Sequence, residues 1–114
     1  MSTKPNWKIR LQNELEQAQT AREAGNEGKT RVCARRAAGI AIGEYLQRNN
    51  IPNSSSSAYN RLQFLASLPD STPRTRQIAQ HLMLRVNEEF KLPIDADLIA
   101  ETRELVEILL DESH

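Results

Sequence analysis

The sequence has little of what builds several common classes of protein. It has one cysteine, five aromatic residues and no net formal charge, with 15 basic and 15 acidic side chains among 114 residues. A single cysteine cannot form an intrachain disulfide or supply a thiolate zinc cluster. No apolar run approaches the roughly 20 residues that cross a bilayer, and the first 20 residues lack the apolar core of a signal peptide. We therefore expect a cytoplasmic protein without a membrane segment, a metal or a cofactor.

What is present is aliphatic and rich in alanine. Hydrophobic residues make up 39% of the chain, and this length suits one domain with an ordinary core. Apolar residues recur at three- and four-residue spacing in five stretches, which is typical of amphipathic helices. These stretches cover about residues 7–24, 29–48, 58–68, 73–90 and 98–109. We find no strand alternation, so the pattern predicts an all-α fold, an antiparallel bundle of four main helices plus one short helix.

Breaks between these stretches carry ordinary helix stop and start signals. Gly25 and Asn26 tolerate the left-handed conformation that ends helices, and Thr72 with Pro73 fits the start of the fourth helix. Pro93 is expected to end that helix, and Asp95 or Asp97 to cap the fifth. Residues 1–6 are expected to form a tail. Residues 49–57, with four consecutive serines, predict a flexible surface loop.

Small residues lie on almost every side of the second helix. Gly39 and Gly43 each cost on the order of 1 kcal/mol of helix propensity relative to alanine, which indicates a close helix crossing, either within the chain or between two chains. Chance spacing in an alanine-rich helix is the alternative. Cys33 lies in the same helix, and a small buried side chain is its expected role rather than a reactive thiol.

Charge is unevenly distributed along the chain. Residues 1–50 carry nine basic and five acidic side chains, residues 51–91 five and three, and residues 92–114 one and seven. The simpler interpretation is that the acidic end lies against the basic body of its own or a partner chain. The alternative is that it screens a phosphate-binding surface.

One pattern could carry chemistry, at the start of the fourth helix. Here Arg74 and Arg76 precede His81, and Arg85 follows it. At about 100° per residue, Arg74, His81 and Arg85 share one side of the helix, while Arg76 falls on the opposite flank. Histidine can shuttle a proton near neutral pH, and arginine neutralises phosphate. His81 with Arg74 or Arg76 as catalytic residues, and Arg85 as a phosphate-binding residue, would suit metal-free RNA cleavage; a purely structural role is the alternative.

The chain resembles the HEPN superfamily (higher eukaryotes and prokaryotes nucleotide-binding) of small helical bundles. The resemblance rests on two parts. The paired opening helices contain Ala18-x-x-Ala21-Arg22-x-Ala24-Gly25-Asn26 and the run from Ala34 to Ile42, ending in Tyr45-Leu46; the second part is the Arg-x4–6-His pattern. Together they span roughly residues 10–110. The resemblance implies a homodimer, and in RNA-cleaving members a histidine that transfers protons and an arginine that stabilises phosphate across the dimer interface.

This chain departs from the family's pattern next to the arginine and the histidine. In this chain Gln77 follows Arg76 and Leu82 follows His81, where catalytic members often have a short polar residue and Gly-Tyr. These differences favour a non-catalytic binding or assembly module, with a protein partner such as a nucleotidyltransferase. A metal-independent, toxin-type RNase is the first alternative. The second is an unrelated helical interaction protein, which predicts that His81 faces away from any cleft or dimer interface.

Overall fold

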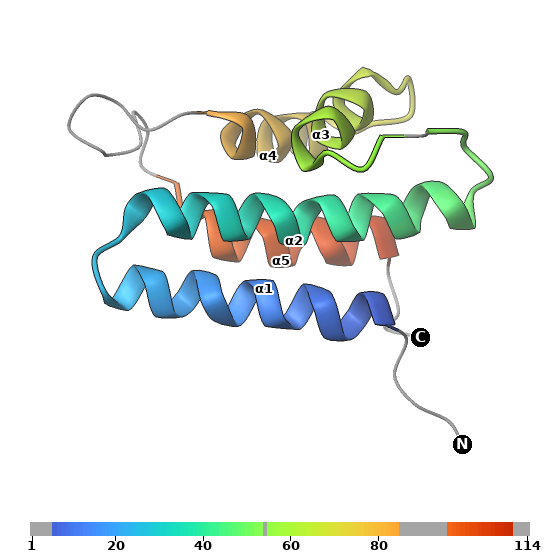
Figure 1. Cartoon of the computed structure of the whole chain (residues 1–114). Helices are drawn as coiled ribbons and strands as arrows, with labels where there is room; N and C mark the ends of the chain where they lie inside the picture. The colour runs from blue at the N-terminus through green and yellow to red at the C-terminus, as the bar shows by residue number, and fades with distance from the viewer. Residues whose placement is uncertain (1–5, 54, 85–95, 111–114) are drawn as a thin grey trace.

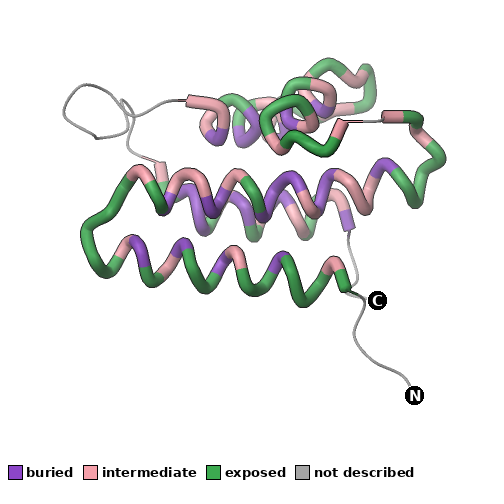
Figure 2. Tube along the Cα trace, in the orientation of Figure 1, coloured by how far each residue is buried: buried purple, intermediate pink, exposed green. Residues whose placement is uncertain are grey.

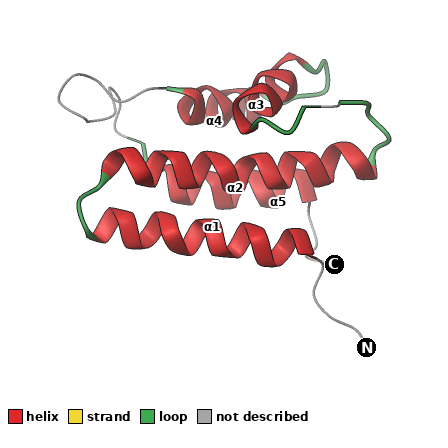
Figure 3. Cartoon of the chain, viewed as in Figure 1, coloured by secondary structure: helices red, strands yellow, loops and turns green. Residues whose placement is uncertain are grey.

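Five helices make up most of the protein in a computed structural model, which describes residues 6–53, 55–84 and 96–110 (Figures 1 and 3). The helices, in chain order, are α1 (Asn6–Glu23), α2 (Glu27–Arg48), α3 (Ala58–Ser67), α4 (Pro73–Met83) and α5 (Leu98–Leu110). The described ranges contain no strand. The all-α prediction is confirmed. None of the helices in these ranges combines the length and apolar character needed to cross a bilayer.

Helix α2 is the central element. It packs against each of the other four helices, with α1 on one side, α3 and α4 on the other, and α5 alongside it (Figure 1). A helix with neighbours on so many sides needs small side chains, because close packing leaves little room between the helix axes. The residues of α2 that are buried are Thr30, Cys33, Ala34, Ala37, Ala38, Gly39, Ala41, Ile42 and Leu46 (Figure 2). The alanine-rich composition thus follows from the central position of α2.

Helices α1 and α2 form an antiparallel hairpin (Figure 1). Gly25 ends α1 in the left-handed region, at φ 76°, where glycine has no steric penalty. Asn26 then caps α2, because its side-chain oxygen accepts a hydrogen bond from the Lys29 N–H at 3.0 Å. The predicted stop at Gly25 and Asn26 is confirmed, and α2 begins two residues earlier than expected.

The connections around α3 are held by short polar side chains. Ser57 caps α3 and Thr72 caps α4, with Pro73 in the first turn of α4. The loop before α3 is partly anchored, since Ile51 packs against the core and its N–H donates to the Leu46 carbonyl at 2.9 Å. The predicted start of α4 is therefore confirmed, whereas the serine-rich loop is not wholly a surface connection.

The glycine pair of α2 marks a close crossing inside the chain. A Cβ atom added at Gly39 would lie 2.8 Å from the Ala58 Cβ and 3.0 Å from the Ala58 Cα, and one at Gly43 would lie 2.5 Å from Nη1 of Arg61. At such distances something must shift, which is the Ala58 backbone at Gly39 and the flexible end of the Arg61 side chain at Gly43. The crossing at Gly39 and Gly43 is therefore between α2 and α3 of one chain. Of the two crossings that the spacing left open, within the chain or between two chains, the structure has the first at this position.

Helix α4 is shorter than its sequence pattern predicts. The apolar spacing that favoured a helix as far as Phe90 is wrong about its end, because α4 ends at Met83 and Leu84 is extended, at ψ 146°. Arg35 donates from Nε to the Leu82 carbonyl at 2.8 Å and from Nη2 to the Leu84 carbonyl at 3.4 Å. These bonds from α2 satisfy carbonyls that the end of a helix leaves unpaired.

Candidate functional site

The predicted Arg–His pattern lies where α4 packs against α5. His81 and Arg74 both reach carboxylates of α5, namely Glu101 and Glu104. Asp97 caps α5 as one of the two expected caps, since its side chain accepts a hydrogen bond from the Ala100 N–H at 3.1 Å. Glu101 and Glu104 are three residues apart on this helix and therefore lie on one face. Arg74 and His81 are thus on one side of α4, as the helical spacing predicts. We call Arg74, His81, Glu101 and Glu104 the α4–α5 cluster.

His81 is paired to one carboxylate through a single ring nitrogen. Nδ1 of His81 lies 2.8 Å from Oε1 of Glu101, and the two side chains are only 21% and 12% exposed. Because an ionised carboxylate accepts hydrogen bonds, Nδ1 carries the proton in this pair. The ring orientation is therefore fixed by α5, and Nε2 is the nitrogen left for other chemistry.

Arg74 forms a two-pronged ion pair with Glu104. Its Nε and Nη2 donate to the two carboxylate oxygens of Glu104, each at 2.8 Å, and Nη2 lies 3.6 Å from Oε2 of Glu101. Its Nη1 donates to the Gln77 side chain at 2.6 Å. The hydrogen bond to Glu104 raises the pKa of Arg74, and the same bond lowers the pKa of Glu104. The fork that would bind a phosphate is occupied by this carboxylate.

Of the other two arginines of the pattern, the structure places only Arg76, and it lies away from His81. Arg76 turns away from α5, and its guanidinium donates to the carbonyls of Ala66 and Leu68 near the end of α3, both at 3.4 Å. It ties α4 to α3. Arg85 lies outside the described residues, so its expected phosphate-binding role is not placed. Of the predicted site residues, the structure brings together Arg74 and His81.

The charge balance of the α4–α5 cluster opposes phosphate binding by this face. Arg74 contributes one positive charge against the two carboxylates of Glu101 and Glu104. A phosphodiester placed here would be repelled by the nearby carboxylates. Among the described residues, no three histidine, cysteine, aspartate or glutamate side chains lie close enough to hold a metal ion.

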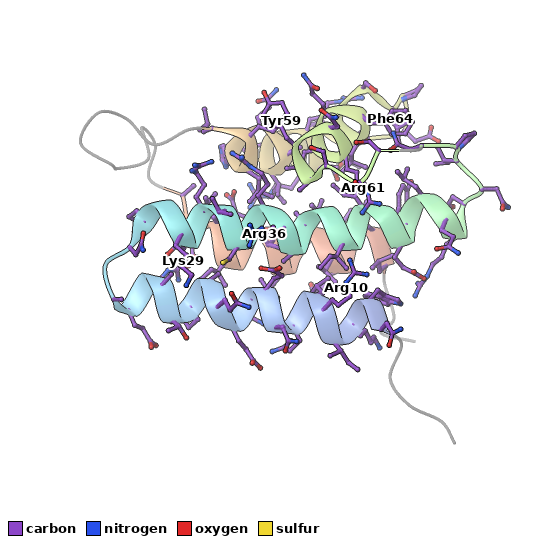
Figure 4. All side chains as sticks on the ribbon, viewed as in Figure 1. Arg10, Lys29, Arg36, Tyr59, Arg61 and Phe64 are labelled. Atoms are coloured by element: carbon purple, nitrogen blue, oxygen red, sulfur yellow. The ribbon has the colours of Figure 1, made fainter. Side chains whose placement is uncertain are left out.

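A second candidate site has the opposite, positive charge. It is a groove between α1, α2 and the start of α3. The groove has a volume of about 600 Å³. Its lining contains four arginines and one carboxylate, Glu14. The residues that line it are Arg10, Asn13, Glu14, Gln17, Val32, Arg35, Arg36, Gly39, Ile40, Ser56, Ser57, Ala58, Tyr59 and Arg61. We call it the arginine groove. Figure 4 shows Arg10, Arg36 and Arg61, from three different helices, gathered along α2 on one face.

Arg61 occupies a fixed position in the arginine groove. Its Nε donates to the Ser55 carbonyl and its Nη1 to the Gly39 carbonyl, both at 2.9 Å. Its guanidinium lies against Gly43, where a side chain would collide with it. Within the described part of the chain, Arg61 is paired with no carboxylate. Carbonyls orient this arginine without neutralising its charge.

Arg36 and Arg10 complete the basic face. Both are exposed, and neither makes a hydrogen bond or ion pair with any residue in the described ranges. Below Arg36, Cys33 is buried as expected, and burial is the main cause of its raised pKa, followed by the charge of Glu14. Arg36 acts on the thiol in the opposite sense. The charge of Arg36 therefore acts on the thiol of Cys33, although the Arg36 side chain itself is exposed.

Sequence reasoning missed the arginine groove and the carboxylates of the α4–α5 cluster. The net charge of +4 over residues 1–50 was a signal for basic character, but it did not show that Arg61, which follows in the second charge block, joins Arg10 and Arg36. That convergence depends on the crossing of α2 and α3. Comparison with models of known families, with curated proteins and with solved structures finds no significant match.

Proposed function

We propose that this chain is a non-catalytic, HEPN-like binding module that recognises anionic ligands or partners through its arginine groove. The observation that carries the proposal is the contrast in pairing. Arg74 is occupied by Glu104, and His81 by Glu101, whereas Arg61 is held by carbonyls and keeps its charge. Anion binding needs cations that are positioned but not already paired with carboxylates.

The HEPN-like arrangement and the dimer are parts of the same proposal. The antiparallel hairpin of α1 and α2, with its alanine-rich second helix, supports the likeness (Figure 1). Helix α5 runs in the same direction as α2 in that view, so the antiparallel four-helix bundle is supported for the hairpin alone. The small-residue edge at Gly39 is covered by α3, so a homodimer would use another, apolar face. Light scattering after size exclusion measures its mass.

An RNA-cleavage assay in the presence of EDTA tests the non-catalytic part. We expect the wild-type chain to leave single-stranded and hairpin RNA intact over hours, and the His81→Ala variant to behave in the same way. When the tagged chain is purified from an extract of its native cells, we expect a protein partner to co-purify with it. The resemblance suggests that this partner is a nucleotidyltransferase. An isolated dimer without a partner in that extract would contradict the assembly role.

One observation favours the alternative, a metal-independent RNase. A carboxylate on Nδ1 of His81 is the arrangement that orients a catalytic imidazole, with Nε2 left to move a proton. In that case Arg74 would have to exchange Glu104 for the scissile phosphate. EDTA-resistant cleavage that is lost in His81→Ala, with an unchanged circular dichroism spectrum, would establish the RNase and refute the non-catalytic module.

A further inference from the structure

The arginine groove has an excess of positive charge in a chain with none overall. Four arginines and one glutamate line it, a net charge of +3, against a net charge of zero for the whole sequence. Clustered cations over a low-dielectric floor attract multiply charged anions more strongly than singly charged ones. A phosphate monoester carries about −1.5 to −2 charges at neutral pH. The charge of the groove suits such a group better than a single carboxylate.

Arg61 supplies a phosphate fork that is already oriented. A guanidinium has five N–H donors, and Arg61 uses one on Nε and one on Nη1 for the two carbonyls. The described residues pair neither donor of Nη2 nor the second donor of Nη1. Gly43 provides the space for this guanidinium against α2. Preorganised donors bind with a smaller loss of side-chain entropy than mobile ones.

The rest of the lining is polar and contains little aromatic surface. Asn13 and Gln17 contribute amides to the lining, and Ser56 contributes a hydroxyl. Tyr59 is the one aromatic residue in the lining, and the Arg35 guanidinium lies 5.6 Å from the centre of its ring. Nucleobases are usually recognised by stacking on aromatic side chains. Amides and hydroxyls match the hydroxyl groups of a sugar or polyol.

We propose that the arginine groove binds a small phosphorylated sugar or polyol, with the phosphate on Arg10, Arg36 and Arg61 and the hydroxyls on the amide and serine side chains of the lining. A volume of about 600 Å³ fits a ligand of this size. The proposal rests on the proposed binding function and names its ligand class. The α4–α5 cluster takes no part in it.

Titration calorimetry with the full chain at low ionic strength tests this site. The probes are ribose 5-phosphate, ribose, inorganic phosphate and adenosine monophosphate. We expect saturable binding of ribose 5-phosphate with one site per chain, weaker binding of inorganic phosphate and none of ribose. Adenosine monophosphate is expected to bind about as tightly as ribose 5-phosphate, because the lining has no pair of aromatic rings to hold a base.

Variants separate the groove from general charge effects. Arg36→Gln removes an exposed cation without hydrogen bonds and should weaken ribose 5-phosphate binding about tenfold. Gly43→Ala leaves every charge in place but displaces the Arg61 guanidinium, and should also weaken binding. The matched control is Arg103→Gln, which removes one exposed arginine of α5, outside the groove lining, and should leave binding unchanged.

Three results would overturn the proposal. They are the absence of saturable ribose 5-phosphate binding, an equal loss of binding in Arg103→Gln, or adenosine monophosphate binding more than about tenfold tighter than ribose 5-phosphate, which would indicate a nucleotide or RNA end instead. EDTA-resistant, His81-dependent RNA cleavage would instead refute the non-catalytic function itself. Failure of the ligand assignment and failure of the proposed function are thus distinguished.

Discussion

The α4–α5 cluster and the arginine groove both contain arginines, but the partners of these arginines differ in charge. In the α4–α5 cluster, Nη2 of Arg74 lies 2.8 Å from a carboxylate oxygen of Glu104. This ion pair joins α4 to α5. In the arginine groove, Arg61 donates hydrogen bonds of 2.9 Å to the carbonyls of Gly39 and Ser55. A carboxylate partner neutralises an arginine, whereas a carbonyl partner only orients it.

This difference shows that the nature of an arginine's partner, more than its place in a motif, decides what it can bind. The motif at the start of α4 draws attention to Arg74 and His81, yet both side chains are already paired with carboxylates of α5. Arg10, Arg36 and Arg61 lie outside the Arg–His pattern and form the more basic surface. Substitutions that act on one region alone test whether the two regions are independent.

The largest expected effect is on the crossing that builds the arginine groove. Gly39→Ala would place a Cβ within 3.0 Å of the Ala58 backbone, which cannot move without shifting α3. We expect a loss of about 1–3 kcal/mol in the free energy of unfolding, measured by urea denaturation. Gly43→Ala meets only the far end of Arg61, and its gain of about 1 kcal/mol in helix propensity should offset the lost contact. Equal effects of the two variants would contradict the crossing described here.

A smaller effect is expected from the pair of His81 with Glu101. His81→Ala removes the hydrogen bond at 2.8 Å to a carboxylate that is only 12% exposed. We expect a loss of about 0.5–1.5 kcal/mol of stability, measured by urea denaturation at pH 7. Binding of ribose 5-phosphate is expected to be unchanged, because the groove lining does not include His81. Loss of ligand binding in a folded His81→Ala variant would join the two regions that we separate.

Much of the fold was predictable because it depends on local signals. The helix starts at Asn26 and Thr72 and the stop at Gly25 follow from side-chain chemistry within a few residues. The end of α4 was not predictable, because the apolar spacing continues past Met83. The structure ends the helix there, where Arg35 reaches its last carbonyls from 47 residues away in sequence. A long-range contact of this kind leaves no periodic signal.

The candidate site was predictable only as a helical face. The spacing placed Arg74 and His81 on one side and Arg76 on the other, which the hydrogen bonds confirm. Their catalytic role stays a prediction. The spacing could not show that Glu101 and Glu104 of a distant helix would occupy that face. The arginine groove was likewise invisible, because three helices supply Arg10, Arg36 and Arg61.

Acid should weaken the carboxylate-paired arginines before it affects those held by carbonyls. Arg74 lowers the pKa of Glu104, and Arg22 lowers the pKa of Asp97 through their side-chain hydrogen bonds. A carboxyl group whose pKa is lowered by folding stabilises the protein above its unfolded-state pKa, and this contribution is lost as pH falls through the folded-state value. We therefore expect urea stability to fall between about pH 5 and the lower folded-state pKa values, and to fall less in Arg74→Gln. An identical pH profile in that variant would contradict the ion pair.

The smallest expected effect uses Cys33 as a probe of the groove. The thiol is buried, and burial and Glu14 raise its pKa while the charge of Arg36 lowers it. Arg36→Gln should therefore raise the pKa of the thiol further, and Arg103→Gln should not. Because the thiol is 1% exposed, alkylation of the native protein should be slow, and its rate should increase with pH at a higher midpoint in Arg36→Gln. An unchanged midpoint would mean that the Arg36 guanidinium points away from the thiol and into solvent, which would leave Arg10 and Arg61 to hold the phosphate without it.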